Sequence, residues 1–126
     1  KQVHKAYHCK HVICVGDLVD NHSGSYHESE PDAYGPEEEY ELSIKYMQEL
    51  QSIFPKMVIT PGNHCLIPQR KAKTVGLPAS MLSNFNRIYG LENTWKWVDV
   101  HKFDSGNGRP VLVPMRLNKK GWDGKI

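Results

Sequence analysis

The sequence predicts an α/β fold with a mostly parallel sheet flanked by helices. Two short apolar runs, residues 11–15 and 57–60, have the composition of buried strands. A helical pattern from Pro36 to Phe54 lies between them, so the order is strand, helix, strand, and the two strands are expected to be parallel. The chain has 126 residues, which is enough for one domain and too short for two ordinary ones.

The first strand and the loop after it are defined by a sharp change in composition. Residues 11–15 are a continuous apolar run between Lys10 and Gly16, which is typical of a strand buried on both faces. Residues 21–36 are rich in Asn, Ser, Gly, Pro and Asp and predict a long surface loop. Loops of this length often carry function.

The helix predicted between Pro36 and Phe54 has signals at both ends. Pro36 suits a first helical turn, and the three glutamates that follow it complement the positive end of the helix dipole. Apolar side chains recur at helical spacing and form one face: Tyr40, Ile44, Met47, Leu50 and Phe54. Pro55 ends the helix, and the second strand follows at residues 57–60.

The second half of the chain predicts one more helix and two more strands. The helix covers residues 78–89, with Gly90 after its end and an apolar face of Met81, Leu82, Phe85, Ile88 and Tyr89. Residues 95–98 alternate and predict a strand, and residues 111–113 with 115–117 predict another. Residues 104–108 are expected to form the turn between them.

The composition is that of a globular protein outside the membrane. Hydrophobic residues make up 39% of the chain, and no apolar run approaches the roughly 18 residues that a membrane helix needs. The net charge of +2 is too small to indicate nucleic-acid binding by itself. Cys9, Cys14 and Cys65 form no Cys-x-x-Cys pair, so reduced thiols in a cytoplasmic protein are expected, with Cys14 a small buried hydrophobe.

Each of the first two strands is followed by a glycine and then by side chains that bind metal ions. Asp17 follows Gly16, and Asn63 and His64 follow Gly62. Because ligands bind in the crevice outside the carboxyl ends of parallel strands, these side chains are expected to lie together. Their oxygens suit Mg²⁺ and Mn²⁺, whereas Zn²⁺ and Fe accept imidazole as well. The pattern predicts a metal site and hydrolytic chemistry.

The residue types suggest a role for each member of this site. Asp17 and Asn63 are candidate metal ligands, and His64 can donate a proton to a leaving oxygen or stabilise an oxyanion. Asp20 is better placed to accept a hydrogen bond that orients a ligand or a catalytic histidine. The alternative is structural: Gly-Asp as a turn or helix cap, and Gly-Asn-His as a turn with an exposed histidine.

The two motifs, Gly-Asp-Leu-Val-Asp at residues 16–20 and Gly-Asn-His at residues 62–64, resemble the second and third signature blocks of the calcineurin-like metallophosphoesterases. The likeness is strongest to the phage and prophage branch and covers about residues 10–100. It implies that Asp17 bridges two divalent metal ions (Mn²⁺, Fe, Zn²⁺ or Mg²⁺), that Asn63 binds one of them, and that His64 contacts the phosphate and assists the leaving group. Asp20 would support them. It also implies part of a four-layer sandwich.

The sequence departs from this family in three places. No Asp-x-His block precedes residue 11, no Gly-His-x-His block follows Asn63, and Cys65 stands where an acid usually follows the Gly-Asn-His block. Residues 1–126 are therefore expected to be a single, truncated metallophosphoesterase domain that binds metal weakly and is a poor catalyst. The alternative is a degenerate, non-catalytic module that binds a partner or nucleic acid.

The expected substrate is a phosphomonoester or phosphodiester, with nucleotides and nucleic acids included. His22 and His27 in the long loop, and Arg70 in the basic run at residues 69–73, are candidate substrate contacts. The alternative for all three is a solvated surface position.

Overall fold

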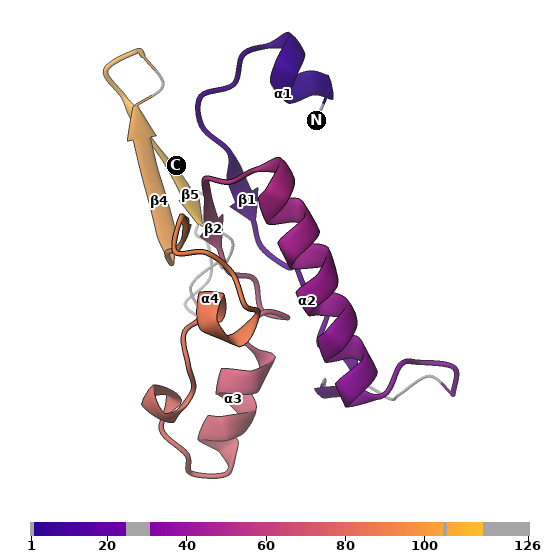
Figure 1. Cartoon of the computed structure of the whole chain (residues 1–126). Helices are drawn as coiled ribbons and strands as arrows, with labels where there is room; N and C mark the ends of the chain where they lie inside the picture. The colour runs from indigo at the N-terminus through magenta and orange to yellow at the C-terminus, as the bar shows by residue number, and fades with distance from the viewer. Residues whose placement is uncertain (1, 25–30, 105, 115–126) are drawn as a thin grey trace.

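The computed structural model describes residues 2–24, 31–104 and 106–114 and has a mixed α/β fold (Figure 1). In chain order its elements are α1 (Gln2–Ala6), β1 (Ile13–Val15), η1 (His22–Gly24), α2 (Pro36–Ile53), β2 (Met57–Thr60), α3 (Ile67–Thr74), η2 (Ala79–Met81), α4 (Phe85–Ile88), β3 (Trp95–Trp97), β4 (Val100–Asp104) and β5 (Pro110–Pro114). The strands form a parallel sheet of three and an antiparallel hairpin. The predicted α/β class with a parallel sheet is confirmed.

The parallel sheet has the strand order β1–β2–β3. Ile13 pairs with Val58, and Val58 pairs with Lys96, both in parallel. The expectation that the first strand is buried on both faces is wrong, because Val15 is 50% exposed. Within the described ranges β1 pairs with β2 alone, and a strand with a neighbour on one side only leaves its side chains partly in water.

The core lies between α2 and one face of the sheet. Figure 1 shows α2 alongside β1 and β2, with the β4–β5 hairpin beyond β2 on the other side. Met57 and Ile59 alternate along β2 and so share a face, where they join Met47 of α2 in one buried cluster. The other buried members are Val19, Cys65, Tyr89, Leu91 and Trp95. Trp95 also donates its indole N–H to the carbonyl of Phe54 over 2.7 Å, which ties β3 to the end of α2.

The helix α2 follows its sequence signals closely. It begins at Pro36 and ends at Ile53, one residue before the predicted end. Near its end the Gln51 amide accepts from the backbone N–H of Glu92 over 2.8 Å and donates to the Glu92 carbonyl over 3.1 Å. This pair of bonds fixes the loop that leads into β3. None of the helices in the described ranges is both long and apolar enough to cross a membrane.

The region between β2 and β3 differs from the sequence expectation. The structure has a helix, α3, that was not predicted, and the single helix predicted over residues 78–89 is broken into η2 and α4. The break has a local cause, because Asn84 is extended (φ −65°, ψ 160°) and its side chain accepts from the backbone N–H of Arg87. A helix that starts at an Asn cap cannot continue from the turn before it. Met81, predicted to be buried, is 68% exposed.

The hairpin also corrects the prediction. β5 pairs with β4, a strand that was not predicted, and β3 belongs to the parallel sheet instead. Of the turn expected at residues 104–108, residues 106–108 lie between β4 and β5 instead of after β3, and Ser105 lies outside the described residues. Residues 115–117, predicted to extend the last strand, lie outside the described residues.

Replacing Asn86 by alanine is expected to destabilise this fold by about 1–3 kcal/mol. The Asn86 side chain is buried, donates to the carbonyl of Trp95 over 2.9 Å and accepts from the indole N–H of Trp97 over 2.8 Å. Its loss leaves a partly buried indole N–H without an acceptor. Urea denaturation measures the change, and Asn93→Ala, at an exposed position nearby, is the matched control. Equal denaturation midpoints for the two variants would contradict the assigned role of Asn86.

Candidate functional site

The candidate site is built at the carboxyl ends of β1 and β2. Val15, the last residue of β1, pairs with Thr60, the last residue of β2, so the two motifs leave the sheet side by side. The backbone N–H of His64 donates to Asp17 Oδ1 over 3.1 Å. Residues 47 positions apart in sequence are thus in direct contact, as the parallel arrangement predicts.

The backbone at the end of β1 turns the Asp17 carboxylate toward the second motif. Gly16 has φ +77° and Asp17 has φ +39°, so two consecutive residues lie in the left-handed region. Glycine adopts this conformation freely, and aspartate is among the residues that tolerate it. An apolar side chain at position 17 would supply no carboxylate oxygens and would adopt this left-handed conformation less readily.

Gly62 makes the approach of Asp17 possible. A Cβ atom placed on Gly62 would lie 2.0 Å from Asp17 Oδ1 and 2.8 Å from the Asp17 backbone nitrogen. Both distances are far below van der Waals contact. The glycine of the Gly-Asn-His motif therefore provides the space that the carboxylate of the other motif occupies.

His64 and Asp20 form the second contact between the motifs. His64 Nδ1 lies 2.5 Å from Asp20 Oδ1 and 3.1 Å from the Asp20 carbonyl oxygen. This bond is the largest influence that raises the pKa of His64, the negative charge of Asp17 adds to it, and partial burial opposes it. Because Nδ1 is held by Asp20, Nε2 is the ring nitrogen available to other groups, and the side chain is 38% exposed. The arrangement favours an oriented imidazolium that can donate a proton from Nε2.

Replacing Asp20 by asparagine is expected to lower the pKa of His64 toward the ordinary value of about 6.5. In the wild type the folded-state pKa is raised, so the ion pair stabilises the fold fully only below the unfolded-state pKa of about 6.5. Its contribution is lost as the pH rises through the raised pKa. NMR titration of the His64 ring protons measures the shift in each variant.

Asp32→Asn is the matched control for this titration, because Asp32 lines the same cavity as Asp20. It removes one carboxylate near the site but not the bond to Nδ1, and it should leave the His64 titration nearly unchanged. A raised pKa that persists in Asp20→Asn would show that this bond does not set it.

Two residues that position the site were not singled out from the sequence. The Asn21 side chain donates to the carbonyl of His64 over 2.8 Å, and Asn21 itself has φ +50°. Glu39, in the first turn of α2, accepts from the backbone N–H groups of His22 and Ser23 over 2.6 and 3.1 Å, and from the Ser23 hydroxyl over 2.7 Å. It therefore anchors the loop after Asp20 to the helix. The sequence signal for Glu39 was a general helix-dipole preference, and Asn21 carried no signal.

Two of the three predicted substrate contacts, His22 and Arg70, lie in the described residues. The side chain of His22 lines a cavity of about 420 Å³ together with Asp20, Asp32 and Glu39. Three carboxylates around one cavity oppose direct binding of a phosphate anion there. Arg70 is exposed on α3, the helix that follows the Gly-Asn-His turn. His27 lies outside the described residues.

The cysteine after the Gly-Asn-His motif belongs to the core. Cys65 is fully buried and joins the cluster around Met47 and Ile59, so its thiol serves in packing. Cys14, expected to be a buried hydrophobe, is half-buried against the same cluster. Burial raises the pKa of the Cys14 thiol, and the neighbouring Cys65 adds to the effect, so the Cys14 thiol stays protonated at neutral pH.

The two predicted metal ligands both lie in the described part of the chain. Asp17 and Asn63 are exposed oxygen donors at the same sheet edge, and this donor set suits a hard divalent cation. In residues 2–24, 31–104 and 106–114, however, no three side chains of His, Cys, Asp or Glu are grouped so that they could hold a metal ion. A metal ion bound by Asp17 and Asn63 would therefore need further ligands.

Comparisons of the chain with models of protein families, with curated proteins and with solved structures gave no match.

Proposed function

We propose that this chain is part of a metal-dependent phosphoester hydrolase of the calcineurin-like type. The observation that supports the proposal best is the double contact between the motifs: Asp17 accepts from the backbone of His64, and Asp20 holds the His64 ring. A chance pair of turns would have no reason to place a carboxylate, an amide and an oriented histidine at one sheet edge. On this proposal, the parallel sheet with α2 on one face forms part of a four-layer sandwich.

Asp17 and Asn63 would hold a divalent cation together with ligands that the described residues do not supply. Mn²⁺, Fe, Zn²⁺ and Mg²⁺ are all compatible with an oxygen-rich site, and the resemblance implies two ions. When bound, such ions polarise a phosphoryl oxygen and lower the pKa of water. Asp17 is suited to this role because it is exposed, although its Oδ1 accepts a hydrogen bond from the backbone N–H of His64.

His64 would hold the proton that the leaving oxygen takes up. Its Nδ1 is bonded to Asp20, which fixes the orientation of the ring, and the same bond raises the pKa of His64, which favours the imidazolium. Asp20 acts through His64, as a positioning residue. The substrate class is a phosphomonoester or phosphodiester, with nucleotides and nucleic acids included.

The proposal is tested with the chain in millimolar Mn²⁺ and an activated diester, bis(p-nitrophenyl) phosphate. Calorimetry is expected to show Mn²⁺ binding no tighter than about 10⁻⁴ M, because few charged ligands are present. Slow hydrolysis that depends on Mn²⁺ is expected, and Asp17→Asn should reduce it to the rate of Mn²⁺ alone while the circular dichroism spectrum is unchanged. Asp32→Asn is the control and should keep wild-type turnover.

Two results would contradict the proposal. Wild-type turnover in Asp17→Asn would remove Asp17 from the site. A folded wild-type chain without any metal-dependent turnover would favour the non-catalytic binding module. That alternative draws its support from the incomplete set of metal-binding side chains in the described residues.

A further inference from the structure

A second cavity, of about 540 Å³, lies at the amino ends of the parallel strands. His11 precedes β1 by two residues, Lys56 stands directly before β2, and Thr94 stands directly before β3. Asp17 and His64 lie beyond the carboxyl ends of the same sheet. The cavity therefore lies at the opposite end of the parallel strands from the candidate metal site.

The lining of this cavity is strongly basic. It includes Lys10, Lys56 and Lys96 together with His11 and His101, and no Asp or Glu is among its residues. Within residues 2–24, 31–104 and 106–114, none of the three lysines forms an ion pair. Several positive charges that converge without counter-charges create a potential that attracts anions.

The basic residues are spread across the three strands of the sheet. His11 precedes β1, Lys56 precedes β2 and Lys96 lies within β3. The register that pairs Ile13 with Val58 and Val58 with Lys96 places Lys96 two residues further along the sheet than His11 and Lys56. Neighbouring strands are about 4.8 Å apart, so the positive charges are separated rather than gathered at one point. The basic character continues toward the N-terminus, where residues 2–16 include Lys5 and no acidic residue. Separated charges of this kind suit a linear polyanion better than a single phosphate.

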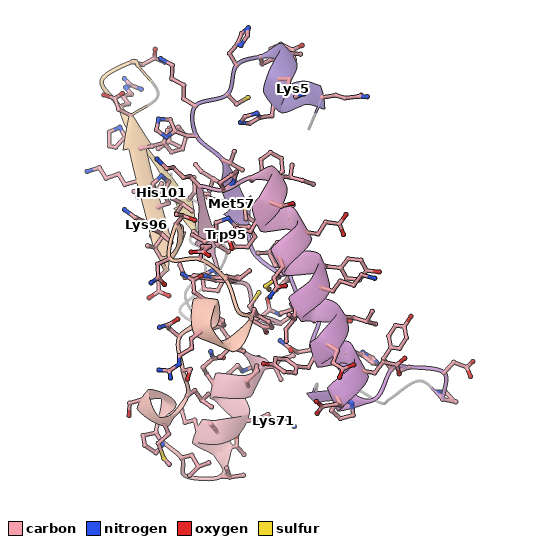
Figure 2. All side chains as sticks on the ribbon, viewed as in Figure 1. Lys5, Met57, Lys71, Trp95, Lys96 and His101 are labelled. Carbon is pink, nitrogen blue, oxygen red and sulfur yellow. The ribbon has the colours of Figure 1, made fainter. Side chains whose placement is uncertain are left out.

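An aromatic surface adjoins these basic residues. His101 lines the cavity from β4, and Figure 2 shows it close to Lys96, whereas Lys71 lies far away on α3. The rings of His101 and Phe103 are stacked with centroids 6.1 Å apart and planes at 19°. Phe103 is 37% exposed, so one side of this pair is open to solvent. A basic groove next to stacked rings is the combination that binds single-stranded nucleic acid.

We propose that this cavity binds single-stranded nucleic acid, with phosphates at Lys10, Lys56 and Lys96 and a base stacked on the His101–Phe103 pair. The lysines supply affinity that does not depend on sequence. The rings supply a preference for unpaired bases, because a base inside a duplex cannot stack on a side chain. The site shares no residue with Asp17, Asn63 or His64, so it does not depend on the proposed hydrolysis.

The test is fluorescence anisotropy of a labelled oligothymidine with the chain in EDTA. EDTA removes divalent metal ions, so metal-dependent hydrolysis cannot occur during the measurement. Three phosphate contacts predict a slope of about −2 in log K against log salt concentration for a single strand. The double variant Lys56→Gln, Lys96→Gln is expected to weaken binding about tenfold at 50 mM salt and to reduce the slope to about −0.7. Phe103→Leu should weaken binding at least about fivefold without changing the slope.

The matched control is Lys45→Gln with Lys73→Gln, which removes the same charge from exposed positions on α2 and α3. It should keep wild-type affinity and slope. If the control variant weakened binding equally, net charge alone would explain the result, and the proposed site would be overturned. Duplex DNA or polyglutamate binding as tightly as the single strand would overturn the single-strand assignment, and so would full competition by equimolar pyrophosphate.

Discussion

Replacing His64 by alanine is expected to slow metal-dependent hydrolysis by about 10²–10⁴-fold when the leaving group is a poorly activated alcohol. Such an alcohol leaves only if it is protonated, and under the proposed function His64, whose ring is held by Asp20, supplies that proton. With p-nitrophenolate as the leaving group the loss should be much smaller, because that anion departs without a proton. The measurement is kcat for phenyl and p-nitrophenyl esters in both proteins.

His101→Ala is the matched control, because His101 lies at the opposite edge of the sheet and should not affect either ester. An equal loss for both esters in His64→Ala would mean that His64 only supports the structure of the turn. No loss for either ester would remove it from the reaction. The Asp20→Asn variant should shift the pH profile of the phenyl ester to lower pH, because it lowers the pKa of His64.

Replacing Gly62 by alanine is expected to destabilise the chain by about 2–4 kcal/mol and to open the candidate site. The added methyl group would meet the Asp17 carboxylate at 2.0 Å and the Asp17 backbone nitrogen at 2.8 Å. One strand end must then move away from the other, which separates Asp17 from the His64 backbone. Urea denaturation gives the stability, and NMR shifts of the His64 amide report the lost bond.

Gly35→Ala is the control for this substitution, since a methyl group there has nothing within 4 Å and Gly35 has φ −66°. It should change stability by less than about 1 kcal/mol. A small effect of Gly62→Ala, equal to that of Gly35→Ala, would show that the strand ends are loosely held and that the close approach is not needed.

Sequence patterns within single strands and helices predicted the central part of the fold. The apolar run before Gly16 and the helix from Pro36 predicted two parallel strands, and their register then brought Asp17 to His64. These features depend on local composition, which a sequence displays directly, and on the regular handedness of a strand–helix–strand crossover. The part of the site that follows from strand ends was therefore predictable.

The remaining features depend on side chains that compete with a local pattern. The apolar spacing of residues 78–89 is helical, but the Asn84 cap interrupts it. β4 was missed because its sequence, Val-His-Lys-Phe-Asp, does not alternate strictly between apolar and polar residues. The Asn21 and Glu39 contacts form only after the loop has folded against α2 and the Gly-Asn-His turn, so no spacing in the sequence announces them.

The contact between Gly62 and Asp17 has a consequence for how the chain can change. An alanine at position 62 is most costly while a carboxylate occupies the space beside it, because the shortest of the unfavourable distances is to Asp17 Oδ1, whereas the distance of 2.8 Å to the Asp17 backbone nitrogen does not depend on that side chain. Removing the Asp17 side chain would relieve much of that clash, so the effects of changes at the two positions should not add. The two changes together would then destabilise the fold less than the single change at position 62. Under the proposed function, the hydrolysis of the phosphoester requires both Gly62 and Asp17.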